Sequence, residues 1–181
     1  MMNDKLSLRR RIGITAVVSL LIWCHLAWDY FHGGIPTHFL FHDKDLPGIP
    51  NWWGGLVLPI FTWFLLFRIH KRIDNSEISL RSESLRKVIL RFFAAALVAI
   101  AISVCFMNGI EVTDYIMGSL FVLAFIFPLY KSEYLLGWVL GSTFSFGAMI
   151  PIGFGSILAL LFFIFYKTSK LILGFFNSKE K

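Results

Sequence analysis

The sequence predicts an all-α integral membrane protein: a six-helix transmembrane bundle forming a single polytopic domain over residues 1–181. Three observations predict this class. The chain is 57% hydrophobic, has a mean hydropathy of +0.72, and contains only 15% charged residues. Apolar runs of about the 20 residues needed to cross a bilayer recur along its whole length. All of the 17 Lys and Arg residues except Lys44 fall on one side of the membrane that these runs imply.

The predicted spans cover about residues 12–31, 52–69, 88–108, 115–130, 134–150 and 153–175. A basic segment precedes the first span, but no small-x-small cleavage site follows it, so we expect an uncleaved helix rather than a signal peptide. Within hydrocarbon only helices or closed barrels satisfy every backbone polar group. These runs are too long and continuous for barrel strands.

Residues near the span ends and centres support the individual helices. Asn51 is expected to cap the second span, and Trp52 and Trp53 to lie in the interfacial aromatic belt. Pro59 and Pro128 are expected to kink their helices. Pro151 is expected in the tight turn before the sixth span, at the outer face.

Small residues predict where helices meet. The third span carries alanines at positions 94–96, 99 and 101, and the fifth carries Gly137, Gly141, Ser145 and Gly147. Small side chains let two helix backbones approach closely within a bilayer. We therefore expect close packing along these two spans.

The distribution of basic residues fixes the orientation. The N-terminus, the second and fourth connections and the C-terminal tail are basic, whereas the first, third and fifth connections contain only Lys44. Both termini are therefore predicted to be cytoplasmic, and a bacterial inner membrane is the expected location. The net charge of +6 follows from this asymmetry and does not indicate a nucleic-acid partner. The polar segment 74–87 fits either a solvated linker or a short helix on the membrane surface.

Ionisable residues gather at the outer end of the first span. His25, Asp29 and His32 are spaced i, i+4, i+7, which places them within an arc of about 60° on one helix face. Ionisable groups at membrane depth are costly and commonly mark functional sites. Gly33 and Gly34 should then end the helix.

The connection after this helix is long for so compact a protein, which is typical of lids and binding loops. Pro36 can start a short helix, on which His38 and His42 would share a face. Both histidines would fit solvent-exposed positions in a loop equally well.

These residues form the candidate site. The predicted metal ligands are His25, Asp29, His32, His38 and His42, a donor set suited to zinc or another divalent metal. The predicted catalytic residues are His25 and Asp29, joined by Glu111 and Asp114 from the third connection. Asp43 and Asp45 are expected to be solvated, and His70 to lie at the inner surface.

The function predicted from this site is hydrolysis of a lipid-like substrate. A metal would lower the pKa of a bound water, or a His–Asp pair would act as a general base. The general arrangement is similar to integral-membrane metal hydrolases of the ceramidase type, which hold metal with a few His and Asp residues on helices. Those enzymes also use ligands from late helices. Here the only candidates beyond Asp114 are Glu133 and Glu180, both on the cytoplasmic side.

Two alternatives remain open. One is a non-catalytic membrane partner or sensor, whose outer loop docks another protein through aromatic side chains. The other is a small proton- or cation-coupled transporter. Membrane lipids are expected partners in every case. The sequence contains neither a GxSxG nucleophile motif nor a phosphate-binding GxxxxGK[ST] loop.

Overall fold

The protein is almost entirely helical. A computed structural model describes residues 8–39, 45 and 47–178. Its α-helices are α1 (Leu8–Phe31), α2 (Gly54–Asp74), α3 (Arg81–Met107), α4 (Thr113–Ile126), α5 (Ser132–Phe146) and α6 (Met149–Ser178). Short elements join them: strands β1 (Thr37–Phe39) and β2 (Gly48–Pro50), and the 3-10 turns η2 (Asn51–Trp53) and η3 (Ile78–Leu80).

Within the described residues, four helical segments are long and apolar enough to cross a membrane: Leu8–Phe31, Asn51–Asp74, Ile78–Met107 and Met149–Phe175. The prediction of an all-helical membrane protein is confirmed at this level. The other two helices are shorter, with 14 residues in α4 and 15 in α5. At 1.5 Å per residue each is about 21–23 Å long, less than the hydrocarbon core of about 30 Å.

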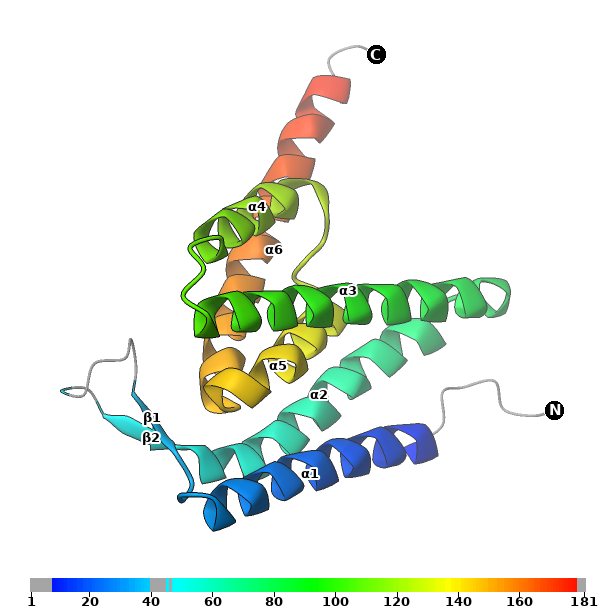
Figure 1. Ribbon diagram of the computed structural model, residues 1–181. Coiled ribbons are helices and arrows are strands. Elements are labelled where there is room, and N and C mark those ends of the chain that lie inside the picture. The colour runs from blue at the N-terminus through cyan, green and yellow to red at the C-terminus, as the bar shows by residue number, and fades with distance from the viewer. Residues whose placement is uncertain (1–7, 40–44, 46, 179–181) are drawn as a thin grey trace.

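The helices enclose α5 (Figure 1). Helices α1 and α2 run antiparallel, and α5 packs against α2, α3 and α6. Helix α6 lies at a steep angle to α3, and α4 packs along one side of α6. The β1–β2 hairpin and the α3–α4 and α5–α6 connections lie toward the left of Figure 1, whereas the start of α1 and the α2–α3 connection lie toward the right.

Prolines set helix ends in two places where the sequence suggested otherwise. Helix α4 ends at Ile126 because Phe127 is extended (φ −109°, ψ 142°) before Pro128, so this proline follows the helix rather than kinking it. Pro151 lies in the first turn of α6, where its missing N–H costs little. The turn itself is made by Gly147, whose φ of +69° favours glycine.

Two further local predictions are wrong. No side-chain hydrogen bond caps α2: Asn51 instead begins η2, and its buried Oδ1 has no hydrogen-bond partner among the described residues. The segment 74–87 is neither a solvated linker nor a separate surface helix. Most of it forms η3 and the first turns of α3, which continue directly into the apolar part of that helix.

Where a short helix was expected after Pro36, the described residues 37–39 instead form a strand of a hairpin. Thr37 pairs with Pro50 and Phe39 with Gly48 in an antiparallel ladder. The backbone N–H of Asn51 donates to the carbonyl of Pro36 at 3.0 Å and extends the pairing. A Cβ on Gly48 would lie 2.9 Å from the Phe39 ring, so glycine lets that ring pack over the strand. Cross-strand pairing therefore outweighs the helical preference at Pro36.

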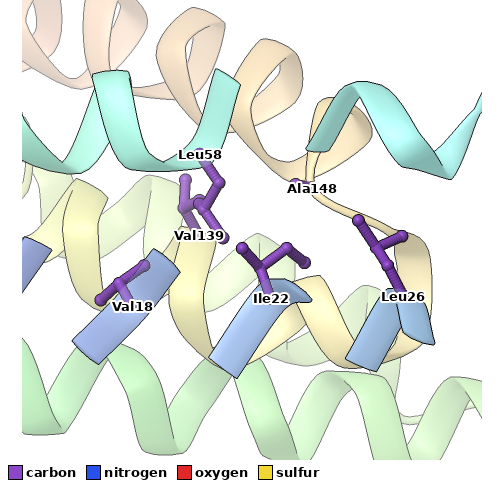
Figure 2. Close-up of a cluster of buried hydrophobic side chains, with 6 residues drawn as sticks. All are labelled: Val18, Ile22, Leu26, Leu58, Val139 and Ala148. Carbon is purple, nitrogen blue, oxygen red and sulfur yellow. The ribbon is translucent and has the colours of Figure 1, made fainter. Parts of the chain in front are cut away.

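The main buried cluster joins α1, α2 and α5 (Figure 2). Val18, Ile22 and Leu26 recur at i, i+4, i+8 and place one face of α1 against Leu58 of α2 and Val139 of α5. Large apolar side chains on the outer faces of the helices are exposed, including Leu20 and Leu21, each 66% exposed. An exterior this apolar suits a lipid environment rather than water.

The predicted close packing of small residues is confirmed between α3 and α5. A Cβ on Gly141 would lie 2.6 Å from the carbonyl oxygen of Ala96. A Cβ on Gly137 would lie 3.0 Å from the amide nitrogen of Ala96. Gly137 also faces the carbonyl of Phe92. Backbone atoms cannot move aside cheaply, so this interface requires glycine.

We expect Gly137→Ala to destabilise the protein by about 1–3 kcal/mol because the added methyl collides with the α3 backbone. Thermal unfolding in a fixed detergent, followed by circular dichroism, measures the change. Gly118→Ala is the matched control, since Gly118 lies within α4 and its Cβ would meet nothing within 4 Å. That variant should be unchanged or slightly more stable. Equal melting temperatures for both variants would contradict the close contact.

Candidate functional site

His25 and Asp29 form a contact pair near the C-terminal end of α1, the end predicted to face outward. One helical turn separates them, and His25 Nε2 lies 3.7 Å from Asp29 Oδ2. Their side chains are 16% and 18% exposed. Asp29 Oδ2 is buried and has no hydrogen-bond partner among the described residues. A small movement of either side chain would bring the two atoms within hydrogen-bonding distance.

Helix α5 also contacts this pair. The His25 ring stacks on Phe144, with ring centroids 4.5 Å apart and an interplanar angle of 22°. The contact fixes the plane of the imidazole while leaving its ring edge free for polar partners. Sequence spacing alone does not reveal Phe144, because it belongs to a distant helix.

His32 turns away from the pair. Its Nδ1 donates to the carbonyl of Trp28 at 2.9 Å, and the two rings stack with centroids 3.8 Å apart. The helix ends immediately afterwards: Gly33 and Gly34 have φ of 126° and 97°, and the Gly34 N–H donates to the Asp29 carbonyl. The three residues share one side of the helix in sequence, but only His25 and Asp29 meet.

The structure leaves the remaining histidine ligands open. His38 lies on β1 opposite Ile49, but its side chain, like all of His42 and Asp43, falls outside the described residues. Asp45 is exposed. The ligand roles of His38 and His42 therefore stay predictions.

Glu111 and Asp114 are exposed near the start of α4. Among the described residues, neither side chain makes a hydrogen bond or an ion pair. Asp114 lies in the first turn of α4, where a carboxylate interacts favourably with the helix dipole. The structure gives these two residues no contact with His25 or Asp29.

The pair could supply two ligands to zinc. Two ligand atoms bound to a tetrahedral zinc at about 2.0–2.2 Å lie about 3.4 Å apart, close to the separation of Nε2 and Oδ2. Over the described part of the chain, however, no group of three or more His, Cys, Asp or Glu side chains comes together. A zinc site would therefore need a ligand from His38 or His42.

A second cluster of charges, the inner cluster, lies near the end of α2 and the start of α5, on the side predicted to be cytoplasmic. Glu133, in the first turn of α5, is fully buried. Its Oε2 accepts a hydrogen bond from Arg72 Nη2 of α2 at 2.7 Å, and its Oε1 accepts one from Arg91 Nη1 of α3 at 3.2 Å. One carboxylate thus joins three helices through charge-assisted bonds.

Lys131 adds positive charge beside this cluster. Burial lowers the pKa of its ammonium group, and the nearby positive charges of Arg91 and Arg72 lower it further. Arg72 and Arg91 thus bond to a single carboxylate, with Lys131 nearby. Together these side chains carry more positive charge than Glu133 neutralises.

Comparison with protein-family models, with curated proteins and with solved structures gives no match for this chain. The geometry of the two clusters therefore carries the functional argument.

The inner cluster was not predicted from the sequence, in which Glu133 stood only as a possible metal ligand on the cytoplasmic side. The sequence does contain a signal for this cluster. Glu133 is a single carboxylate at the start of an apolar helix, on the side of the protein where arginines are concentrated. His70 was expected at the inner surface, and this was wrong, since it is only 8% exposed within α2.

Glu133→Gln should lower the free energy of unfolding by about 2 kcal/mol. The amide can accept at most one of the two arginine bonds, and its NH₂ group would face the other guanidinium. We place the loss below that of a fully buried pair because both arginines are partly exposed. Thermal unfolding in detergent measures it.

Glu83→Gln is the control for that measurement. Glu83 forms an exposed ion pair with Lys87 at 2.6 Å, and losing it should leave the melting temperature unchanged. If Glu133→Gln is as stable as Glu83→Gln, the inner cluster does not hold the three helices together.

Proposed function

We propose that the chain is a six-span protein of a bacterial inner membrane with both termini in the cytoplasm. The basic N-terminal turn of α1 and the α2–α3 connection lie on the same side of the fold, opposite the hairpin and the α3–α4 connection (Figure 1). This separation agrees with the positive-inside distribution of the basic residues. For α4 and α5 to cross, local thinning of the bilayer or extended flanking residues must offset their short length.

Cysteine labelling tests this orientation. In a background of Cys24→Ala and Cys105→Ala, Glu111→Cys should react with a membrane-impermeant maleimide on intact cells. Ser82→Cys should react only after the membrane is permeabilised. Both positions are exposed in the fold, so a difference in labelling reports the side of the membrane. Labelling of Ser82→Cys on intact cells would overturn the proposed topology.

We further propose that His25 and Asp29 are the acid–base pair of a hydrolase that acts on a lipid-like substrate at the outer face. The observation that supports this most directly is the buried Asp29 oxygen, which lacks a hydrogen-bond partner and lies 3.7 Å from His25 Nε2. Ionisable groups placed this way at membrane depth are retained for a function. An apolar exterior gives amphiphilic molecules direct access from the bilayer.

We assign separate roles to the two imidazole nitrogens. Because Nε2 faces Asp29, the neutral ring would carry its proton on Nε2 and keep a lone pair on Nδ1. Nδ1 would accept a proton from water, and the resulting hydroxide would attack an ester or amide carbonyl. His25 would then return that proton to the leaving alcohol or amine. Asp29 would stabilise the imidazolium formed between these two steps.

Zinc or another divalent metal belongs to the metal-dependent form of this proposal. His25 and Asp29 would hold it, with a further ligand from His38 or His42. A bound metal would supply an activated water at neutral pH. The separation of the His25 and Asp29 ligand atoms supports this form.

Hydrolysis of a panel of long-chain esters and N-acyl amides by the reconstituted protein tests the proposal. We expect His25→Ala and Asp29→Asn to lower the rate by about 10²–10⁴-fold, the usual contribution of a positioned base. His32→Ala is the matched control, because its ring bonds to its own helix backbone. It should retain the rate.

The same preparation separates the two forms of the proposal. Metal bound to the wild type and lost in His25→Ala supports the metal-dependent form, whereas a rate that survives a chelator supports the metal-free pair. No hydrolysis across the panel, or equal rates in all three variants, would overturn the catalytic proposal.

A docking role is the second candidate, and one observation favours it. Trp52 and Trp53 stack at 4.5 Å and are 42% and 45% exposed at the base of the hairpin. Such an aromatic pair would suit a protein partner on the outer face as well as the membrane interface. Transport by a proton- or cation-coupled route stays a prediction that no described contact favours.

A further inference from the structure

A cavity opens between α1, α2 and α3 at the inner end of the protein. It has a volume of about 280 Å³ and is lined mainly by apolar side chains. These apolar side chains include Ile14 of α1, Ile69 and Ile73 of α2, and Ile89 and Phe92 of α3. The lining on α3 extends from Leu85 to Phe93, which corresponds to about 12 Å along the helix. This shape fits part of an acyl chain.

The inner end of this cavity is positively charged. Arg10 lines it directly, from the first turn of α1. Glu133 also lines it, but Arg72 and Arg91 neutralise that carboxylate. The hydrogen bond to Glu133 does not occupy either guanidinium fully, since Arg72 is 39% exposed and Arg91 is 26% exposed. Each keeps N–H donors for another anion.

Apolar walls and a cationic end together select one class of occupant. A neutral hydrocarbon would leave the arginines without an additional partner, and a free phosphate would leave the apolar walls empty. A phospholipid with a net negative head group satisfies both parts. Cytoplasmic-side basic pockets between membrane helices are suited to such head groups.

We propose that an anionic phospholipid of the inner leaflet binds in this cavity. One acyl chain lies between Ile14 and Phe92 over the α2 isoleucines. The phosphate lies at Arg10, within reach of the positive charge carried by Arg72 and Arg91. This site is separate from the His25–Asp29 pair, so an experiment on lipid binding tests it independently of the hydrolase proposal.

Native mass spectrometry of the full-length protein tests the site. The protein is released from nanodiscs that contain equal amounts of phosphatidylglycerol and phosphatidylcholine, and retained lipid is counted. We expect the wild type to retain phosphatidylglycerol in preference to phosphatidylcholine. Arg10→Gln should reduce the retained phosphatidylglycerol about fivefold, the effect of one basic residue near an anionic lipid. Arg9→Gln, a neighbouring exposed arginine that does not line the cavity, should retain it.

A second pair of variants tests the apolar part. Ile89→Trp should fill the cavity and displace the lipid, whereas Leu90→Trp, on an adjacent exposed position outside the cavity, should not. Unchanged far-ultraviolet circular dichroism spectra confirm that all four variants remain folded. Equal retention of the two lipids by the wild type, or equal losses within either matched pair, would overturn the proposal.

Discussion

Neutralisation of one buried carboxylate constrains the inner half of the molecule. Glu133 has no exposed surface, and an unpaired charge in that position would be prohibitively costly. Arg72 near the end of α2 and Arg91 within α3 must therefore reach the first turn of α5 together. Their bonds fix the positions of these three helices along one another.

The bonds to Glu133 also affect the opposite end of the fold, because α5 connects the two ends. Glu133 lies near its start and Phe144 near its end, about 16 Å apart at helical rise. Between them, Gly137 and Gly141 bring the α5 backbone directly against α3. The helix therefore cannot slide without breaking either the arginine bonds or this close contact. Its placement sets where Phe144 meets His25, so the orientation of the outer imidazole depends on packing established at the opposite end.

Sequence predicted well wherever the determining interaction is local or periodic. Long apolar runs identified the helices, glycine and alanine content identified α3 and α5 as closely packed helices, and a separation of four residues brought His25 to Asp29. Interactions between distant segments were not predictable in this way. Thr37 joins a hairpin because Pro50 lies opposite it, which removes the helix expected there. Arg72 is 61 residues from Glu133 in the chain, and no local pattern pairs them.

The same helix carries both proposed sites, and its length decides how they relate. Arg10 and Asp29 lie about 28 Å apart along α1, close to the full hydrocarbon thickness of about 30 Å. In the proposed topology, a lipid held at Arg10 would occupy the inner leaflet, whereas a substrate of His25 would arrive from the outer one. The two proposals therefore concern different molecules. The effect of the lipid at Arg10 would be to supply a countercharge to Arg10 and fill the space between α1 and α3, and so stabilise the framework that positions His25.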